Sequence, residues 1–149
     1  GGMPIAAYCT TKEIAEAFGS GTHGSTYGGH PVACAAALAS ISEILDKDLS
    51  GNAKVVGEYM VEQMAKLPHV KEARGRGLLV GCEYDLPIAL EVKWGCMRRH
   101  ALITAIGSSV NRMIPPLIAT KEDVDKLMGI MEESINEAVE KYQKLTKAA

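Results

Sequence analysis

Residues 109–125, SVNRMIPPLIATKEDVD, join a strand pattern to the start of a helix. Side chains alternate between the two faces of a strand, so residues 109–115 predict a strand with Arg112 among apolar neighbours on one face. Asn111 and Met113 fall on the opposite face. This stretch therefore indicates a fold that mixes strands and helices.

A long helix is predicted to begin after Thr120. Thr120 and Asp123 have the spacing of a capping box, in which two side chains satisfy free N–H groups at a helix start. Apolar residues then recur at helical spacing and form the stripe that we expect to be buried. The stripe consists of Val124, Leu127, Met131, Ile135, Ala138 and Tyr142.

Three short runs in the C-terminal two thirds favour strands and are punctuated by glycine and proline, at residues 77–84, 101–107 and 109–115. A helix is expected between the first two, over residues 86–100. Another precedes them, with apolar residues at helical spacing: Val56, Met60, Met64 and Leu67. Few strands, helices on one side and no βαβ rhythm predict the α+β class, with a sheet covered on one face by helices.

The N-terminal third has a different pattern. TTKEIAEAF, residues 10–18, predicts a short helix capped by Thr10. A loop dense in Gly, Ser and Thr follows at residues 19–31 and ends in Pro31, a residue preorganised for the first helical position. The alanine-rich residues 32–48 are then expected to form a helix packed closely against another backbone.

A polar break, DKDLSGN at residues 46–52, separates this helix from the rest of the chain. We therefore predict two domains, residues 1–48 and residues 49–149.

The composition excludes several classes of protein. The 149 residues are 47% hydrophobic and 23% charged, with a formal net charge of −2, which favours a folded protein over a nucleic-acid or membrane binder. No apolar run approaches the roughly 20 residues needed to cross a bilayer. The four cysteines form no C-x-x-C pair and no signal segment is visible, so a cytoplasmic location is predicted. No metal site is expected, because no second His or Cys lies at ligand spacing from His23.

The loop around Ser25 and Thr26 carries the clearest chemical signal. Glycines let backbone N–H groups approach an anion, and neighbouring hydroxyls can donate to its oxygens. A nucleotide-binding P-loop is excluded, because Ser25 stands where that motif requires lysine after Gly24. The residues alone leave two interpretations, an anion-binding loop or an ordinary surface turn.

Four segments together resemble the class III aminotransferases, enzymes that use pyridoxal 5'-phosphate (PLP). GGMPIAAY resembles the segment after the cofactor lysine, and HGSTYGGHPVACAAAL resembles the phosphate loop and its helix. RGRGLLVGCEY and NRMIPPLIATKEDVD resemble the two C-terminal signatures of the family, in the family's order. The resemblance implies the last segment of a large PLP-binding domain over residues 1–48. Residues 49–149 would be the small C-terminal α+β domain of a fold-type I aminotransferase, with a short and mainly antiparallel sheet.

The resemblance also implies roles for individual residues. Ser25 and Thr26 would hold the PLP phosphate across a homodimer interface, and His23 would shape the loop. Arg112 would bind a carboxylate at the substrate entrance, a duty that suits the bidentate guanidinium group. The residues alone leave open the alternative that Arg112 extends from a strand into solvent. Arg74 and Arg76 are interpreted as structural residues that pair with acids on the large domain.

The resemblance assigns no catalytic residue to this chain, because the Schiff-base lysine would lie upstream of Gly1. The implied reaction transfers an amino group from N-acetylornithine, or an ornithine-like donor, to 2-oxoglutarate in arginine biosynthesis. His30 departs from the family, which has asparagine before the proline. Two alternatives stay open: a non-catalytic folding or dimerisation module, and another class III enzyme such as ornithine or 4-aminobutyrate aminotransferase or an aminomutase.

Overall fold

The structure is a computed structural model that describes residues 2–147. These residues form two compact units, 2–47 and 48–147. Gly1, Ala148 and Ala149, at the outer ends of the two predicted domains, lie outside the described residues.

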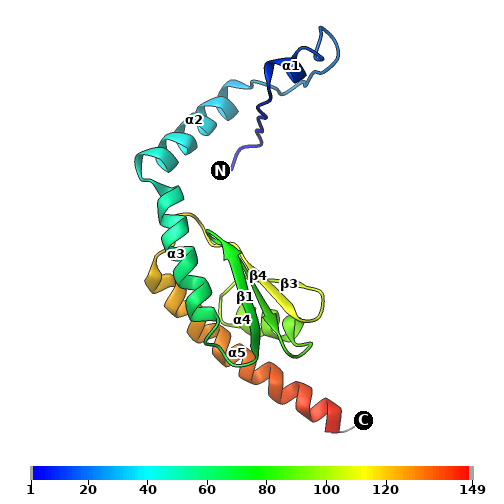
Figure 1. The fold of residues 1–149 in the computed structure, drawn as a ribbon, viewed down its shortest axis with the longest axis vertical. Coiled ribbons are helices and arrows are strands. Elements are labelled where there is room, and N and C mark those ends of the chain that lie inside the picture. Colours follow the sequence, from blue (N-terminus) through cyan, green and yellow to red (C-terminus); the bar gives the residue numbers. More distant parts are fainter. Residues whose placement is uncertain (1, 148–149) are drawn as a thin grey trace. The chain divides into compact units, whose positions relative to one another are not determined.

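The first unit begins with a single helical turn, α1, Lys12–Ala15 (Figure 1). Its cap is Thr11, whose side chain accepts a hydrogen bond from the backbone N–H of Ile14. The prediction that Thr10 caps this helix was therefore wrong by one residue, because either threonine of the pair satisfies the sequence signal.

The long helix of the first unit, α2, spans Pro31–Asp46. Pro31 occupies the start of the helix, as its fixed φ angle predicts. Of the described residues 2–47, only Ala33 is buried, while Leu38, Ile41 and Leu45 are exposed. Within the described residues, the alanine-rich helix is therefore largely unburied, although its composition predicts close packing against another backbone.

The second unit contains a four-stranded sheet, β1 Val70–Arg76, β2 Leu79–Tyr84, β3 Thr104–Ile106 and β4 Val110–Met113. The strand order is β1-β2-β4-β3, and each neighbouring pair is antiparallel. The predicted α+β class and antiparallel sheet are confirmed, but the sequence predicted three strands and missed β1.

Helix α3, Leu49–Met64, begins inside the polar stretch that was predicted to separate two helices. Asp48 adopts a left-handed conformation and its side chain accepts a hydrogen bond from the backbone N–H of Gly51, 3.2 Å away. This N-cap lets the helix start immediately after a two-residue break, at Lys47 and Asp48.

The helices cover one face of the sheet. Helices α3 and α4, Ala89–Arg98, contact the strands, and α5, Lys121–Lys147, packs on both of them (Figure 1). Because α3, α4 and α5 share this side, the inward residues of β2 and β4 are buried: Val80, Cys82, Tyr84, Asn111 and Met113.

The start of α5 has the predicted capping box. The Thr120 N–H donates to the Asp123 carboxylate over 3.1 Å, and the Asp123 N–H donates to the Thr120 hydroxyl over 3.2 Å. Most of the predicted stripe is buried, whereas Leu127 and Tyr142 are half-buried against the core. Additional buried residues of the helix are Met128, Ser134 and Val139.

Two glycines allow backbone segments of the second unit to touch. A Cβ atom on Gly57 of α3 would lie 2.0 Å from the carbonyl oxygen of Gly77 in the β1–β2 turn. On Gly95 of α4, a Cβ atom would lie 2.8 Å from the Cβ of Ser134 on α5. Any larger residue at either position would force these elements apart.

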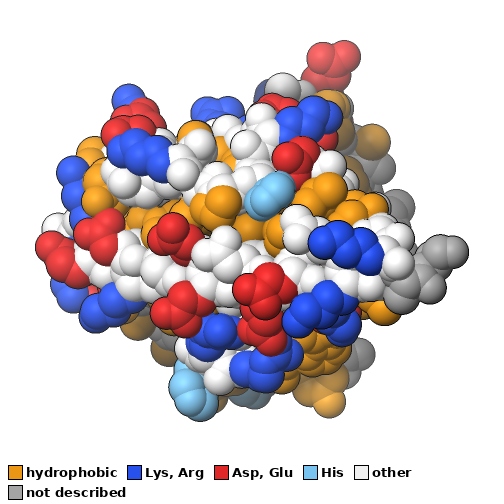
Figure 2. Space-filling model, turned by 90° about the horizontal axis from the view of Figure 1, so that it is seen from below, with side chains coloured by type: hydrophobic (Ala, Val, Ile, Leu, Met, Phe, Trp, Pro, Cys, Tyr) orange, Lys and Arg blue, Asp and Glu red, His pale blue; other side chains and the backbone are white. Residues whose placement is uncertain are grey.

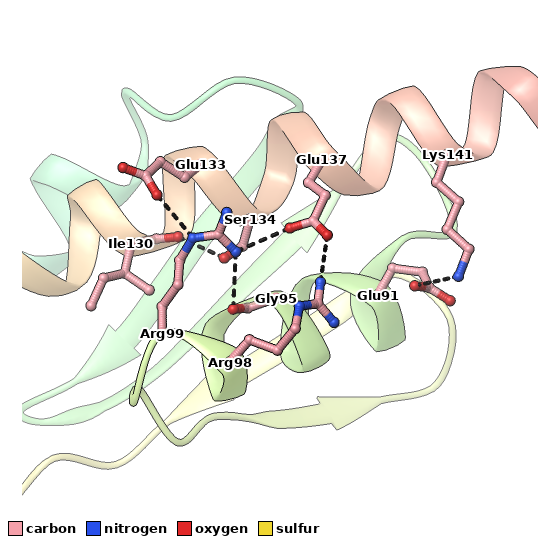
Figure 3. A network of polar contacts seen from close by, with 9 residues as sticks. All are labelled: Glu91, Gly95, Arg98, Arg99, Ile130, Glu133, Ser134, Glu137 and Lys141. Atoms are coloured by element: carbon pink, nitrogen blue, oxygen red, sulfur yellow. Dashed lines mark hydrogen bonds and ion pairs between the residues drawn. The ribbon is translucent and has the colours of Figure 1, made fainter.

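A polar network ties α4 to α5 (Figure 3). Arg99 donates to Glu133 over 2.8 Å and to Glu137 over 3.0 Å, and Arg98 donates to Glu137 over 2.6 Å. The hydrogen bond from Arg99 helps to hold the pKa of Glu137 below its ordinary value. These exposed pairs orient the helices but contribute little stability singly.

Acidic and basic side chains are interspersed with apolar ones on the face that Figure 2 shows. This mixture agrees with the small net charge of the chain. Over the described part of the chain, no helix combines the length and apolar character needed to cross a bilayer.

Candidate functional site

Arg112 lies on the sheet face that the helices leave uncovered. It is exposed, whereas its strand neighbours Asn111 and Met113 are buried. The predicted alternation along β4 is therefore confirmed. Arg112 is directed away from the core and is available to a ligand.

One cross-strand row contains Arg112 and passes through all four strands. Arg74 of β1 pairs with Gly81 of β2, Gly81 pairs with Arg112 of β4, and Arg112 pairs with Thr104 of β3. Directly paired residues in antiparallel strands share a face of the sheet. The two arginines of this row thus flank a glycine.

A groove of about 450 Å³ lies on this uncovered face. Three arginines line it, Arg74, Arg76 and Arg112, and Leu79 and Gly81 of β2 lie between them. Three guanidinium groups around one small hollow favour an anionic ligand, and their geometry matches a carboxylate or a phosphate group.

The three arginines differ in their partners. Arg74 donates to Glu72 over 3.0 Å and to Glu83 over 2.9 Å. These carboxylates raise the pKa of Arg74, with Glu83 the larger cause. Hydrogen bonds from Lys71 and then Arg74 lower the pKa of Glu83. Within the described residues, the acids that pair with Arg74 lie on β1 and β2, and pairing with acids of the large domain stays a prediction.

The side chains of Arg112 and Arg76 have no hydrogen bond or ion pair to any other described residue. Their donors point to solvent or to a ligand. Arg76 and Arg112 are thus two cationic side chains of the groove that no carboxylate of the described residues neutralises.

A buried polar contact anchors the strand that carries Arg112. The hydroxyl of Tyr84 donates to Asn111 over 2.9 Å, and the Asn111 amide donates to the carbonyl of Ala89 over 3.0 Å. Tyr84 and Asn111 are both buried, and burial strongly raises the pKa of the Tyr84 hydroxyl. This contact joins β2, β4 and the start of α4, and it fixes the backbone on one side of Arg112.

The Ser25–Thr26 loop belongs to the first unit. The N–H of Gly28 donates to the carbonyl of Ser25 over 3.4 Å, and Gly29 has a φ angle of 71°. A Cβ atom on Gly28 would lie 3.3 Å from the Cβ of Ser25. The two glycines thus let the chain turn tightly just before α2.

Neither hydroxyl of Ser25 or Thr26 has a hydrogen bond within the described residues, and both residues are exposed. The cap of α2, His30, provides no side-chain hydrogen bond, so N–H groups at the start of the helix are also free to bind an anion. Free hydroxyls, a glycine turn and a helix N-terminus form a donor set that fits a phosphate group.

The predicted site residues fall into two groups. Ser25 and Thr26 lie in the unit 2–47, and Arg112 lies in the unit 48–147. Sequence reasoning missed Arg76 as a residue of the groove because it missed β1, and it missed Gly81 because the register of β1, β2 and β4 is not a local signal. Two arginines spaced two residues apart, at 74 and 76, were the available signal, since strand neighbours of that spacing share a face.

Comparison with known proteins finds relatives over most of the chain. A family model, Aminotransferase class-III, matches residues 1–135. Acetylornithine aminotransferase of Caldanaerobacter subterraneus subsp. tengcongensis is 38% identical over 141 residues, covering 92% of this chain and 36% of that protein. Ornithine aminotransferase 2 of Staphylococcus aureus strain Mu50 is 39% identical over 130 residues, covering 84% of this chain and 32% of that protein.

Solved structures agree with these relatives. The ornithine aminotransferase of Toxoplasma gondii, described with partial occupancy of PLP at its active site, matches with a TM-score of 0.77 and 30% identity. The match covers 88% of this chain and 32% of that structure. Acetylornithine aminotransferase of Elizabethkingia anophelis matches with a TM-score of 0.73 and 29% identity, covering 83% and 33%. The chain thus spans about a third of the length of the relatives that it matches.

Proposed function

The chain belongs to the class III aminotransferases, and on that premise we propose that it is the C-terminal part of an enzyme of arginine biosynthesis. The proposed reaction transfers an amino group from N-acetylornithine, or an ornithine-like donor, to 2-oxoglutarate. Support comes from curated relatives named for acetylornithine and ornithine. The observation that carries the substrate assignment is the unpaired guanidinium of Arg112 on an open, cationic groove.

In this proposal, PLP is the cofactor, and when bound it supplies the electron sink that amino-group transfer requires. Ser25 and Thr26 bind its phosphate through their free hydroxyls, aided by the N–H groups at the start of α2. Hydroxyl and amide donors suit a phosphate dianion because they stabilise its charge without adding a competing base.

Arg112 binds the carboxylate of the amino acid or 2-oxo acid and orients it. A bidentate guanidinium–carboxylate pair fixes both position and direction, which is the task of a substrate-binding residue. The adjacent contact between Asn111 and Tyr84 keeps the strand in place while the ligand exchanges.

The whole protein is proposed to be a cytoplasmic homodimer in which a preceding segment contributes the lysine that binds the cofactor covalently. Residues 2–47 then form the end of a large PLP-binding domain. By this assignment the chain on its own is inactive, because the residues proposed here bind and orient but none can act as the nucleophile.

The test uses the protein encoded by the complete reading frame that contains this chain. We expect transamination with 2-oxoglutarate, and N-acetylornithine, ornithine and 4-aminobutyrate are compared as donors by their kcat/KM values. Arg112→Gln should raise KM for the 2-oxo acid, and Arg112→Lys should restore part of the loss. Lys144→Gln, an exposed charge on α5, is the matched control. Preference for another donor would reassign the substrate, and an unchanged KM in Arg112→Gln would remove the role of Arg112.

A second candidate function is a non-catalytic folding or dimerisation module. One observation favours it: α2 exposes Val32, Leu38, Ile41 and Leu45, an apolar surface of a kind that promotes association.

A PLP-binding experiment on the 149-residue chain tests whether the chain alone holds the cofactor. The chain is mixed with PLP, binding is followed by the absorbance of PLP, and borohydride is added to trap any adduct between PLP and a lysine. Weak phosphate binding at most and no trapped adduct are expected. A trapped adduct on a lysine of this chain would contradict the assignment of the cofactor lysine to a preceding segment.

A further inference from the structure

We propose that the hollow between α3 and the end of β1 binds a free α-amino acid by its zwitterionic head group. The carboxylate of the ligand binds Arg76 and Lys54, and its ammonium group binds Glu58. Arg112 does not line this hollow. The inference therefore does not depend on the proposed transfer of an amino group.

The hollow has a volume of about 760 Å³. This volume suits a small molecule, since such sites commonly measure about 300–1,000 Å³. Residues 75–77, at the end of β1 and in the turn after it, form one wall. The other wall is one face of α3, because residues three or four positions apart share a helix face. It consists of Ser50, Lys54, Gly57, Glu58 and Val61.

Glycines hold the two walls together without filling the space between them. A Cβ atom on Gly57 would lie 2.0 Å from the carbonyl oxygen of Gly77, so the helix and the turn touch through their backbones. A Cβ atom on Gly75 would lie 2.6 Å from the carbonyl oxygen of Leu79. The charged side chains of the hollow thus project from a backbone frame that packing fixes, as a binding site requires.

Three charged side chains line the hollow, and none is neutralised by the chain itself. The side chains of Lys54, Glu58 and Arg76 have no hydrogen bond or ion pair to any other described residue. Spacing does not explain why the first two stay apart. Glu62 and Lys66, also four residues apart, form an ion pair of 2.9 Å at the end of the same helix. Both signs of charge are therefore available to one ligand.

The charges of the hollow select the class of ligand. A dianion would bring a negative charge beside Glu58, and a simple amine would be repelled by Lys54 and Arg76. An α-amino acid carries one carboxylate and one ammonium group on a single carbon. Lys54 and Glu58 lie one helical turn apart, about 6 Å along the axis, so their flexible side chains can bind both groups. The guanidinium fork of Arg76 matches the carboxylate.

Val61 marks the apolar end of the hollow. It lies almost one turn beyond Glu58 and is half-buried against the core. A ligand whose ammonium group binds Glu58 can place its own side chain on Val61. We therefore expect an aliphatic side chain to be preferred over a cationic one, which would also be repelled by Lys54 and Arg76.

Norvaline, an unbranched five-carbon amino acid, is the probe. It is titrated into the 149-residue chain, and NMR shifts are followed at fixed ionic strength. We expect millimolar binding with shifts centred on Gly57, Val61 and Arg76. Shifts centred on Gly81 and Ile106 instead would place the ligand in the sheet groove and overturn the inference, as would the absence of norvaline-dependent shifts.

Three further compounds test which parts of norvaline are recognised. Pentanoate lacks the ammonium group, butylamine lacks the carboxylate, and ornithine adds a second amine at the end of the same carbon chain. Each should bind about fivefold or more weakly than norvaline, the effect of losing or opposing one partly exposed ion pair. Equal affinity of pentanoate and norvaline would overturn the role of Glu58. Equal affinity of butylamine and norvaline would overturn the roles of Lys54 and Arg76, and that of ornithine the preference at Val61.

Glu58→Gln and Lys54→Gln separate the two charges of the head group. Both residues are exposed, so the fold should be kept. Each variant should bind norvaline about fivefold more weakly, but pentanoate binding should fall only in Lys54→Gln. The matched controls are Glu140→Gln and Lys144→Gln, two exposed residues four positions apart on α5. Equal losses in the controls would indicate a general charge effect and refute the site.

Arg76→Gln tests the residue on the opposite wall, with Lys71→Gln as a control that removes one charge from the same strand. Binding of both norvaline and pentanoate should weaken by about fivefold in Arg76→Gln and stay unchanged in Lys71→Gln. Unchanged norvaline binding in Arg76→Gln would refute the role of Arg76. Failure of all these tests would leave the proposed role of Arg112 untouched, because that role is measured by transamination.

Discussion

Replacing Asn111 with alanine should destabilise the second unit strongly and disturb the strand that carries Arg112. Asn111 is fully buried and accepts a hydrogen bond from the hydroxyl of Tyr84, which is only 2% exposed. No buried side-chain polar atom among the described residues lacks a partner in the native protein. In Asn111→Ala the Tyr84 hydroxyl would lose this acceptor and keep only the thiol of Cys82, a weak one.

The magnitude follows from these contacts. Leaving the Tyr84 hydroxyl unsatisfied costs about 1–3 kcal/mol, and the lost bond from the Asn111 amide to Ala89 costs roughly another 1 kcal/mol. The free energy of unfolding should therefore fall by about 2–4 kcal/mol. For a unit of this size, that loss corresponds to a thermal midpoint lowered by roughly 10–20 °C.

Urea unfolding followed by circular dichroism measures the change, and a double-mutant cycle with Tyr84→Phe isolates the contact. In the Tyr84→Phe background, Asn111→Ala should cost about 1–2 kcal/mol less, because no hydroxyl is left without a partner. Ile114→Ala, at an exposed position just beyond β4, is the control and should change stability by about 0.5 kcal/mol or less. A coupling energy near zero would refute the view that this hydrogen bond anchors β4.

Three further predictions concern the rest of the second unit and the cysteines. Gly57→Ala should lower the free energy of unfolding in urea by about 1–3 kcal/mol or more, because its Cβ atom would collide with the β1–β2 turn. The control, Gly129→Ala on the open side of α5, should leave this free energy unchanged or raise it. Folding lowers the pKa of Glu83, so the ionised Glu83 stabilises the fold above its ordinary pKa of 4.5, and this stabilisation is lost as pH falls through the lowered pKa. In Glu83→Gln the thermal midpoint should therefore fall less steeply as the solution is acidified. Ellman's reagent should label the exposed Cys9 in the native chain but should label Cys82 only on unfolding, because burial raises the Cys82 pKa to about 11. Fast labelling of Cys82 in the native chain would contradict its burial.

The parts of the fold that sequence predicted correctly depend on local signals. The capping box of Thr120 and Asp123 involves residues three positions apart, and its geometry is the same in any protein. The face of Arg112 follows from the period of two along β4. Both were predicted because neither depends on which distant segment lies nearby.

Strand β1 was missed because its identity depends on a distant partner. The sequence VKEARGR contains four charged residues and a glycine, which locally indicate a loop. Its hydrogen bonds to β2, and the backbone contact that Gly57 permits beneath the turn, make it a strand. The row that contains Arg74, Gly81 and Arg112 depends on the register of three strands, and no periodicity within one segment reveals that register.

The two groups of site residues differ in how firmly the fold holds their backbone. We expect this difference to decide which ligand the isolated chain binds. The groove residues project from strands whose opposite faces are packed against helices, so their backbone positions are held by the core. Ser25 and Thr26 lie on a loop with no buried residue, where water competes for the phosphate and screens the charge. Ligand binding in the groove should therefore survive in the isolated chain. Phosphate binding by the loop should require another segment to exclude water from it, which is the contribution expected of the remainder of a class III aminotransferase.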